Sequence, residues 1–599
     1  MKFNDLKEYI KIIDTPLDIN LEIPHLAYIE AKKKNPKILM FTNPKEGNKK
    51  FDMPVVMNIF ANDKVVEKIF GKNLDLIAAE IEELIKLKPP KTLSEKLKIF
   101  GKLFALKNTI PKRVKSAECQ YYVKQGEAVN LNDLPILKTW PLDGGKFITM
   151  GQVYTKSLDG ETRNVGMYRL QVYDDKRLGL HWQIHKDSAH LFWEYKKAGV
   201  KMPVSVAIGG DPLYTWCATA PMPPGIFELM LYGFIRKENP RLIKCISNDL
   251  EVPADADIVI EGWCDPEELE IEGMFGDHTG YYTLKKPFPV MHVETITTKK
   301  EPVYYATVVG KPPLEDKYMG YATERIFLPL LKTSAPDLID YAMPENGVFH
   351  NLILAKIAPR YPGHSMQIMH SLWGVGQMSF VKHAVFVDEN APDLRDYENL
   401  TRYILNNFDK KRVLISKGIV DELDHSSVEE LVGGKLGVDA TKNEKWKMEN
   451  GKLKILNDEE LLKKLKSVEP LIENVRQYFT DTKNPICVIK FKKQNCAKNI
   501  FDKIKEFKEN LRIVVFIDTD EADNPYMLVW RVTNNIDALR DVWIDEIVGI
   551  DGSNKNAIDG FTREWPPDVD VDKNVIEKLK NLGLIEGISE EELKKYQII

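Results

Sequence analysis

From about residue 118 to residue 300 the chain consists mainly of short apolar runs rich in β-branched and aromatic residues. Such runs predict β-strands, because these side chains fit a pleated, partly buried surface. Two helical segments interrupt the series. We therefore expect a barrel-like or sandwich-like β domain with inserted helices. The runs, in chain order, are FITMGQVYT, NVGMYRLQVY, LGLHWQIH, PVSVAIGG, ADIVIEGW and PVMHVETIT.

The segments on either side of the β domain mix helices and strands. Before it, LIAAEIEELIKLK predicts an amphipathic helix and PVVMNIF a strand; after it, SFVKHAVFVDE and LRDYENLTRYILNNFD predict a strand and then a helix. The fold class is therefore multi-domain, with α/β and β parts, as 599 residues require. We expect an N-terminal α/β cap domain (1–115), the β domain (116–305), a C-terminal α/β domain (306–445), an insertion (446–560) and a C-terminal helical segment (561–599).

We predict an internal repeat in the C-terminal part of the sequence. The pattern AVFVDENAPDLRD, RYILNNFD and GVDATKN, which begins at Ala384, is echoed by VVFIDTDEADNP, RVTNNID and GIDGSNK, which begins at Val514. A Lys/Glu-rich stretch separates the two copies. We interpret the second copy as a degenerate duplicate of one α/β unit that adds scaffold or an oligomer contact.

Composition excludes several classes of protein. With 43% apolar residues, 29% charged residues and a net charge of -5, the chain resembles an ordinary soluble protein and carries no sign of a nucleic-acid partner. Its first residues, MKFNDLKEYIKIID, lack the apolar core of a secretory signal, and no apolar run approaches the roughly 20 residues that cross a bilayer. Six cysteines without a CxxC pair suit a reducing compartment. We expect a cytoplasmic protein, with peripheral membrane association at most.

Glu228 is an acidic residue in the otherwise apolar segment PPGIFELMLYGFIRK. We expect this segment to be a buried helix that starts at Pro223 and Pro224. An ionised carboxylate buried there costs several kcal/mol unless a cation or a hydrogen-bond network meets it. The partner is either an arginine or a metal ion.

Further candidate ligands lie upstream, in two predicted strands. Asn164 is on NVGMYRLQVY, and alternation in HWQIH puts His181, Gln183 and His185 on one face of a strand. Asparagine, histidine and glutamate together suit Mg, Mn or Fe better than structural zinc. The competing interpretation is that the histidines are ordinary buried residues of a strand.

Two carboxylates and an arginine form a second candidate group. Glu272 and Asp277 lie in the glycine-rich loop IEGMFGDHTGYY, where glycines let the backbone approach a ligand closely. Acid–base work at neutral pH requires a raised pKa in one carboxyl group, and a nearby arginine requires the other to be ionised. Arg169 follows Asn164 by five residues, so a β-bulge at Gly166 is needed to turn both to one face. The alternative is a solvated turn.

These residues resemble the UbiD family of reversible decarboxylases, which use prenylated FMN. The resemblance covers nearly the whole chain and is carried by NVGMYRLQV (164–172), HWQIH (181–185), KCISNDLEVPADADIVIEG (244–262) and EGMFGDHTGYY (272–282). It implies a central split β-barrel that binds the flavin. It also implies that the cofactor acts as electron sink while carbon dioxide leaves an aromatic or unsaturated acid.

The resemblance assigns roles to individual residues. It implies that Asn164, His185 and Glu228 bind a divalent ion, usually Mn²⁺, at the flavin phosphate, and that Arg169, Glu272 and Asp277 are catalytic. Asp277 is Asp as in the polyprenyl-hydroxybenzoate branch. A K⁺ ion would be held by backbone carbonyls near Cys217 to Ala220. The implied flavin contacts are Met167, Tyr168, Arg169, His181, Trp182, Gln183, Lys186 and Asp187.

The chain departs from shorter members of the family. His181, Lys186 and Asp187 stand where the quinone-pathway branch carries Arg and Arg-Gly, and 445–560 is an insertion. Chains of this length with HWQIHKDS, WCATAPMP and GKPPLEDKYMGY are similar to long bacterial menaquinone-biosynthesis decarboxylases, which implies 1,4-dihydroxy-6-naphthoate as the substrate.

Several alternatives stay open. The substrate could instead be polyprenyl-4-hydroxybenzoate or another hydroxyarenoate, and the enzyme could run as a carboxylase. A function of another class is a flavin-carrying or flavin-prenylating protein, although a carrier has no need of a proton relay such as Arg169, Glu272 and Asp277 would form. The resemblance also implies a flavin prenyltransferase that supplies the cofactor, and a homo-oligomer, either dimer or hexamer.

Overall fold

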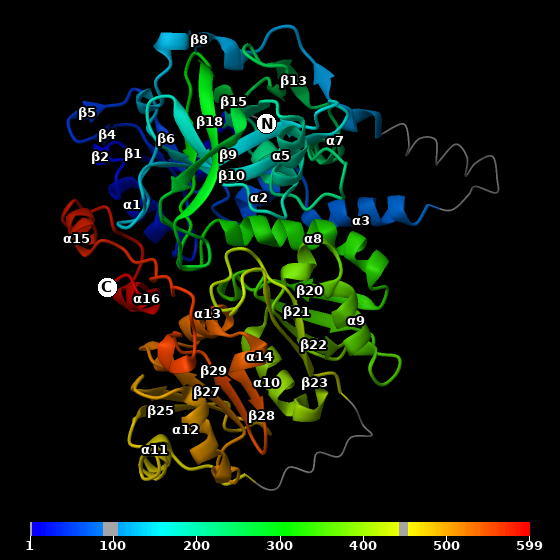
Figure 1. Ribbon diagram of the computed structural model, residues 1–599, viewed down its shortest axis with the longest axis vertical. Helices are drawn as coiled ribbons and strands as arrows, with labels where there is room; N and C mark the ends of the chain where they lie inside the picture. Colours follow the sequence, from blue (N-terminus) through cyan, green and yellow to red (C-terminus); the bar gives the residue numbers. More distant parts are fainter. Residues whose placement is uncertain (1–2, 88–105, 443–452) are drawn as a thin grey trace. The chain divides into compact units, whose positions relative to one another are not determined.

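Six antiparallel strands close a β-barrel in the central part of the chain (Figure 1). The order is β11-β10-β9-β12-β15-β18, and pairing between β11 and β18 completes the ring. Each of the six strand runs predicted from the sequence supplies one strand, so the predicted β domain is confirmed as a barrel. The strands are β9 (Phe147–Lys156), β10 (Arg163–Val172), β11 (Arg177–Leu180), β12 (Met202–Ile208), β15 (Ile258–Glu272) and β18 (Lys286–Thr298).

The computed structural model describes residues 3–87, 106–442 and 453–599. These residues divide into a barrel unit (Met1–Ile326 with Asp568–Ile599) and a C-terminal unit (Phe327–Pro567). No helix within the described residues is long and apolar enough to cross a bilayer. All six cysteines are described and free, and five are buried, where a free cysteine packs as a small apolar side chain.

Helices are inserted between the barrel strands, as the sequence predicts. Helix α5 (Asp187–Ala198) follows β11, while α6 (Pro212–Cys217) and α7 (Leu229–Arg236) follow β12. The predicted start of α7 at Pro223 and Pro224 is wrong. These prolines are exposed and Gly225 has a positive φ of 78°, so the chain turns there and the helix begins only after Glu228.

The N-terminal segment forms the predicted α/β structure. A four-stranded sheet combines β1 (Ile10–Ile13), β3 (Ile38–Phe41) and β6 (Val55–Met57) with β19 (Tyr304–Ala306), which follows the barrel in sequence. The last strand therefore ties this sheet to the barrel. Three α-helices accompany it: α1 (Glu22–Ala31), α2 (Asp63–Phe70) and α3 (Leu74–Ile85).

Small sheets and two C-terminal helices complete the barrel unit. Helix α15 packs near α1, where Lys578 pairs with Glu22. The remaining elements are β2 (Leu17–Asp18), β4 (Pro44–Glu46), β5 (Lys49–Lys50), β7 (Lys112–Arg113), β8 (Tyr122–Gln125), β13 (Arg241–Lys244), β14 (Glu251–Pro253), β16 (Phe275–Gly276), β17 (Tyr282–Thr283), α15 (Lys573–Asn581) and α16 (Glu590–Lys595).

The C-terminal unit contains two sheets with the same topology (Figure 1). Their orders are β20-β21-β22-β24-β23 and β25-β26-β27-β29-β28; in both, the two outer pairings are antiparallel and the two inner ones parallel. This confirms the predicted duplicated α/β unit. We call the two copies the first repeat and the second repeat.

The first repeat follows the long helix α8 (Asp316–Ser334) and consists of β20 (Leu338–Ala342), β21 (Leu352–Ile357), α9 (His364–Trp373), β22 (His383–Asp388), α10 (Tyr397–Asn407), β23 (Val413–Ile419) and β24 (Val432–Asp439). The second repeat consists of α11 (Asp458–Lys466), β25 (Ile472–Tyr478), β26 (Ile486–Phe491), α12 (Ala497–Ile504), β27 (Ile513–Ile517), α13 (Pro525–Asn535), α14 (Ala538–Asp541), β28 (Val542–Ile544) and β29 (Val548–Asp551).

A buried glutamate makes the stability of the barrel unit depend on pH. Glu315 is 2% exposed and accepts a hydrogen bond from the backbone N–H of Phe60 at 3.0 Å. Burial raises the pKa of Glu315 to about 7. A carboxyl group with a raised pKa binds more protons in the folded than in the unfolded state, so stability falls as the pH rises from its ordinary pKa toward 7.

We expect Glu315→Gln to remove this pH dependence, because a glutamine cannot ionise. Between about pH 5 and about pH 8 the variant should lose on the order of 3 kcal/mol less stability than the wild type. Melting temperatures at the two pH values measure the difference. Glu301→Gln, at an exposed glutamate, is the control and should behave as the wild type. An unchanged pH dependence in Glu315→Gln would show that Glu315 is ionised in the folded protein.

Candidate active site

Arg169, on β10, lies between two buried carboxylates. Its Nε and Nη2 atoms donate to Glu272 at 3.2 and 2.6 Å, and its Nη1 atom donates to Asp277. Glu272, at the end of β15, is 1% exposed. Asp277, just after β16, is also buried. The three residues that the sequence predicts to be catalytic therefore form one hydrogen-bonded group, and the alternative of a solvated turn is excluded.

The predicted β-bulge is present in β10, but it lies at Arg169 rather than at Gly166. Gly166 pairs in register with β9, whereas the register shifts between Tyr168 and Leu170. A Cβ atom on Gly166 would lie 2.2 Å from the Tyr168 ring, so the glycine makes room for that ring. The bulge removes Arg169 from the regular ladder and lets its side chain turn toward the carboxylates.

Glu272 has a second partner, His181. The Nδ1 atom of His181 lies 2.9 Å from Oε2 of Glu272, and the imidazole packs against Phe288 with 4.3 Å between ring centroids. Burial acts to raise the pKa of Glu272, but Arg169 and His181 outweigh it and lower the pKa to about 2. Glu272 is therefore ionised in the free protein at neutral pH.

Asp277 is ionised as well. Burial again acts to raise its pKa, but Arg169 and the neighbouring His278 hold the pKa well below its usual range. Thr283 bridges the group, because its Oγ1 accepts from Arg169 at 3.2 Å and donates to Asp277 at 3.0 Å. The expectation that one of the two carboxyl groups has a raised pKa is wrong for the free protein, since one guanidinium contacts both.

The glycines of the Glu272–Asp277 loop pack against the protein itself. A Cβ atom on Gly273 would lie 2.6 Å from the Cα atom of Gly144, and one on Gly276 would lie 2.3 Å from Trp140. Close packing within the protein therefore requires both glycines. Their role is to let the loop lie flat beside 140–144, which fixes the position of both carboxylates.

Glu228 lies beside the strand that carries Asn164. It is 6% exposed, and its Oε2 atom accepts the backbone N–H of Val165 at 2.9 Å. Burial raises the pKa of Glu228 to about 7, and Asp187 adds to the rise. No arginine or lysine pairs with Glu228 among the described residues, so the structure does not support the arginine alternative. A buried carboxylate with an unmet charge suits a metal ion.

Asn164 and the segment before α5 lie next to one another. The Nδ2 atom of Asn164 donates to Ser188 at 2.9 Å and to Thr155 at 3.2 Å, so its amide oxygen is the atom that can face a cation. Ser188 is the second residue of α5, and His185 precedes it by three residues. The structure thus brings Asn164 close to Glu228 and to the start of α5, where His185 is found. Among the described residues, no three His, Cys, Asp or Glu side chains lie together in a way that could hold a metal ion. The predicted set of Asn164, His185 and Glu228 contains only two residues of these types.

The predicted strand HWQIH is wrong. Strand β11 ends at Leu180, and a turn in which the N–H of Lys186 donates to the carbonyl of Gln183 at 3.0 Å leads into α5. His181, Trp182 and Gln183 are nevertheless buried. The strand stops because the chain must leave the barrel to enter α5, a tertiary requirement that alternation in sequence does not reveal.

Several of the predicted flavin contacts offer polar atoms for a cofactor. His181 Nε2 and Trp182 Nε1 are buried and have no hydrogen-bond partner among the described residues. Buried polar atoms of this kind are rare in folded proteins and are commonly satisfied by a ligand. Lys186, at the N-cap of α5, and the exposed Asp187 lie at the edge of the same segment. The residues present therefore fit a heteroaromatic group such as a flavin.

The β10 backbone also contacts the segment predicted to hold K⁺. The N–H of Met167 donates to the carbonyl of Ala218 at 2.9 Å, and the carbonyl of Cys217 accepts from Ala220 at 3.0 Å. A carbonyl has two lone pairs, so each oxygen retains one for a cation. Tyr168, between Met167 and Arg169, has a pKa raised to about 12 by burial and remains neutral.

Sequence reasoning missed several residues that position the group. Asp143 accepts the N–H of Gly276 at 2.8 Å, and Gln171 accepts that of Gly273 at 2.7 Å. Gln171 lies two residues beyond Arg169 on the same strand, so alternation could have revealed it. Asp143 lies more than a hundred residues away in sequence, and no local pattern marks it. Thr283, Ser188 and His278 were also missed; His278 adjoins Asp277 and could have been noticed.

The comparisons with known proteins agree with this geometry. Family models of the 3-octaprenyl-4-hydroxybenzoate carboxy-lyase match its N-terminal domain to residues 5–85, its Rift-related domain to 112–312 and its C-terminal domain to 317–440. Together these spans include every residue of the group described above. The chain belongs to the UbiD family. UbiD proteins of this class are carboxy-lyases, so the chain is a UbiD-type decarboxylase.

Relatives of this UbiD protein fall into two lengths. A Helicobacter pylori (strain J99) protein is 55% identical over 589 residues, which is 96% of this chain and 94% of the relative. An Aquifex aeolicus protein is 44% identical over 461 residues, which is 75% of this chain but 93% of the relative. The Aquifex protein therefore lacks a counterpart for about a quarter of the chain.

Solved UbiD-class structures share the fold. HmfF from Pelotomaculum thermopropionicum, in complex with FMN, has a TM-score of 0.62 and 25% identity, covering 75% of this chain and 95% of its own. The vanillic acid decarboxylase of Sedimentibacter hydroxybenzoicus has a TM-score of 0.64 and 21% identity, covering 77% and 96%. The barrel and the α/β parts of this UbiD chain thus have solved counterparts.

We expect His181 to set the charge of Glu272 in this UbiD protein. His181→Leu removes the Nδ1–H donor, so the pKa of Glu272 should rise and the limb of the pH–rate profile that reports Glu272 should move to higher pH. His181→Asn keeps an N–H donor at nearly the same position and should restore most of the wild-type profile. The pH dependence of kcat measures both. Identical pH–rate profiles in the wild type and His181→Leu would show that His181 does not act on Glu272.

Proposed function

We propose that this chain decarboxylates a hydroxylated aromatic acid with prenylated FMN, and that its substrate is 1,4-dihydroxy-6-naphthoate, in menaquinone synthesis. The single observation that carries the proposal is the buried Arg169 held between Glu272 and Asp277. The motifs HWQIHKDS, WCATAPMP and GKPPLEDKYMGY support the naphthoate as substrate. A polyprenyl-4-hydroxybenzoate or another hydroxyarenoate is the second candidate, favoured by the aspartate at position 277.

Prenylated FMN would supply the electron sink that takes up the electron pair of the breaking bond to carbon dioxide. Asn164, His185 and Glu228 would hold a Mn²⁺ ion at the flavin phosphate, with K⁺ beside it at carbonyls near Cys217 to Ala220. The buried Nε2 of His181 and Nε1 of Trp182 would contact the flavin. A separate flavin prenyltransferase would supply the cofactor, and the assembled enzyme would be a homo-oligomer.

The protein's own residues would move the proton. Glu272 and Asp277 are ionised in the free protein, so neither stores a proton at neutral pH. An anionic substrate placed beside them raises their pKa values, because like charges disfavour ionisation. Glu272 would then take up a proton from solvent or from a ring hydroxyl and deliver it to the carbon that has lost carbon dioxide, while Asp277 and Arg169 hold it in position.

The test is incubation of cofactor-loaded enzyme with 1,4-dihydroxy-6-naphthoate and, separately, with 4-hydroxybenzoate derivatives. Release of carbon dioxide and the mass of the product identify which acid loses its carboxyl group. Release from the naphthoate supports the proposal, and release only from the benzoates contradicts the substrate. Incubation of the products with bicarbonate measures the reverse reaction.

A flavin-carrying or flavin-prenylating protein is the candidate of another class. The absorption spectrum and mass of the bound flavin, followed by the carbon dioxide assay, separate it from an enzyme. A carrier would bind prenylated FMN and release no carbon dioxide from any acid. The buried Arg169, Glu272 and Asp277 group argues against a carrier, because a carrier needs no proton relay.

A further inference from the structure

The two repeats of the C-terminal unit contact each other through equivalent faces. Helix α10 of the first repeat and α13 of the second occupy the same place in their sheets, and each ends in an Asn-Asn pair, at 406–407 and 534–535. Leu405 and Phe408, at the end of α10, pack in one cluster with Ile513 and Val548 of the second repeat. Ile536, at the end of α13, packs with Leu436 of the first repeat.

These contacts are reciprocal, position by position. Phe408 and Ile536 both follow the Asn-Asn pair, and Val548 and Leu436 both pair with the first residue of the neighbouring parallel strand. Phe408 of the first repeat thus packs in one cluster with Val548 of the second, and their equivalents, Ile536 and Leu436, pack together in another. Reciprocal contacts of this kind define an isologous interface, the type found about a two-fold axis.

Hydrogen bonds also cross between the repeats in both directions. The Nδ2 atom of Asn484, just before β26, donates to the carbonyl of Leu405 at 2.7 Å. In the opposite direction, Asn351, just before β21, donates to Oδ1 of Asn534 at 2.9 Å. His383, the first residue of β22, contacts the carbonyl of Thr533 at 3.1 Å. Each repeat thus satisfies backbone or amide groups at the helix end of the other.

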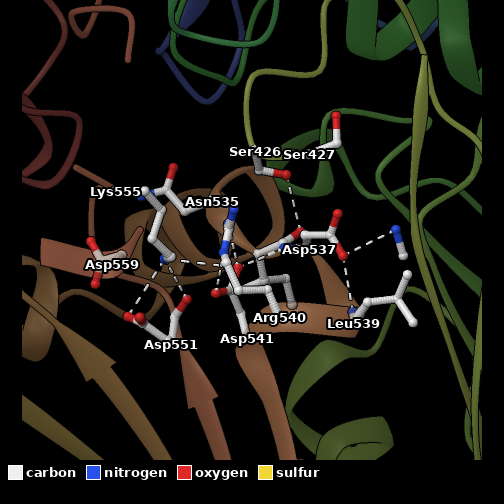
Figure 2. Close-up of polar contacts among 12 residues, drawn as sticks. Ser426, Ser427, Asn535, Asp537, Leu539, Arg540, Asp541, Asp551, Lys555 and Asp559 are labelled. Atoms are coloured by element: carbon white, nitrogen blue, oxygen red, sulfur yellow. Dashed lines mark hydrogen bonds and ion pairs between the residues drawn. The ribbon is translucent and has the colours of Figure 1, made fainter. Parts of the chain in front are cut away.

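Buried polar groups also lie at the interface between the two repeats, which we call the seam. Figure 2 shows Ser426 of the first repeat facing the segment of the second that carries Asp537, where Ser426 donates to the carbonyl of Ile536 at 3.2 Å. Lys382, 1% exposed, pairs with Asp424 at 2.7 Å and donates to the carbonyl of Asn534 at 3.1 Å. If the two repeats separated, the buried ammonium group of Lys382 would lose a hydrogen-bond acceptor. We therefore expect the repeats to stay together.

We infer that the second repeat occupies, within one chain, the place that a second copy of the first repeat would take. The UbiD-family models end at residue 440, and the Aquifex relative matches only 75% of this chain. A chain without the second repeat would expose the face that carries Leu405, Phe408 and Leu436. An isologous face is complementary to itself, so its partner in such a chain is a second copy of the same chain. In this protein that face is closed internally, and any homo-oligomer uses other surfaces.

Gly434 on β24 offers a way to open the seam. Its N–H donates to Oδ1 of Asp537 at 3.1 Å, and a Cβ atom on Gly434 would lie 2.5 Å from the backbone nitrogen of Leu539 and 2.6 Å from that of Ala538. A side chain at this position must push the second repeat away. Gly374, where an added Cβ meets nothing closer than 3.5 Å, is a matched control in the same repeat.

The experiment mixes equal amounts of unlabelled and ¹⁵N-labelled full-length protein and cross-links lysines. Lys410 of the first repeat donates to the carbonyl of Glu546 at 3.2 Å, and Lys508 of the second lies 3.4 Å from the carboxylate of Glu546. A cross-link between Lys410 and Lys508 therefore reports the seam, and its isotope content shows whether one chain or two supplied the lysines.

In the wild type we expect only cross-links of a single isotope. Gly434→Val should lose the Lys410–Lys508 cross-link and double the mass in light scattering, because the first-repeat faces of two chains then pair with each other. Adding Phe408→Glu should return the mass to the wild-type value, because a charge on this apolar face disfavours the pairing. If the Gly434→Val variant does not fold, Gly434→Ala places a smaller side chain at the same position. Gly374→Ala should match the wild type. Hybrid cross-links in the wild type would overturn the inference. So would a Gly434 variant that loses the Lys410–Lys508 cross-link and keeps the wild-type mass.

Discussion

We expect replacement of Glu272 by glutamine to stop decarboxylation and leave the flavin bound. Glutamine keeps the size of the side chain and an oxygen that accepts from Arg169, but it cannot carry a proton to the substrate carbon. General acid–base groups contribute typically about 10²- to 10⁴-fold to rate, so we expect a loss of at least that size in kcat. Carbon dioxide release measures the activity, and the visible absorption of the purified protein measures the flavin.

The matched control for this substitution is Glu267→Gln. Glu267 lies on the same strand, β15, but its side chain is 76% exposed and far more weakly held, in a pair with Lys196 at 3.9 Å. The control variant should keep wild-type activity. A Glu272→Gln enzyme that turns over at the wild-type rate would remove Glu272 from proton transfer, and a variant that loses its flavin would show that Glu272 serves binding instead.

The sequence was sufficient to predict the barrel and the repeat. Each of the six apolar runs from FITMGQVYT to PVMHVETIT became a barrel strand, because β-branched and aromatic side chains strongly favour strands and helices separate the runs only twice. The repeat was visible because both copies keep the strand ending in Asp and the Asn-Asn pair at a helix end. The Asn-Asn pair lies at the interface between the copies, where Asn534 accepts from Asn351 and Asn406 accepts from the N–H of Lys483, which gives a physical reason for its similarity.

The errors came where tertiary contacts decide local structure. HWQIH alternates like a strand, yet β11 ends at Leu180 because the chain must turn into α5. Prolines 223 and 224 look like a helix start, yet the positive φ at Gly225 delays α7 to Leu229. The spacing of Asn164 and Arg169 correctly predicted a bulge in β10. Its position was predicted wrongly, because the Tyr168 ring lies over Gly166 and the register shifts at Arg169 instead.

The electrostatics of the candidate site were the least predictable feature. The sequence gives Arg169, Glu272 and Asp277 without showing that one guanidinium contacts both carboxylates, and only that contact lowers both pKa values. The residues that hold the loop, Asp143 and Gln171, act across more than a hundred residues of sequence. Single-sequence patterns describe local periodicity and carry no information on such distant contacts.

We expect replacement of Glu228 to empty the proposed metal site and release the flavin. The buried carboxylate accepts the N–H of Val165 at 2.9 Å and has no ion-pair partner among the described residues, and burial raises its pKa to about 7, so the fold gains little from its charge. Glu228→Gln keeps an acceptor for Val165 and should therefore melt no lower than the wild type when both are metal-free. Loss of a charged ligand should lower metal affinity by at least the roughly 10- to 100-fold seen for supporting residues of metal sites.

Metal content by plasma mass spectrometry and flavin by absorbance, both on purified protein, measure this effect without an activity assay. Glu238→Gln, at an exposed glutamate ten residues further on, is the control and should keep metal and flavin. A Glu228→Gln protein that retains both would show that Glu228 only holds the backbone of β10, and Asn164 and His185 would then need another partner. A protein that keeps flavin without metal would show that flavin binding does not need the ion that Asn164, His185 and Glu228 would hold.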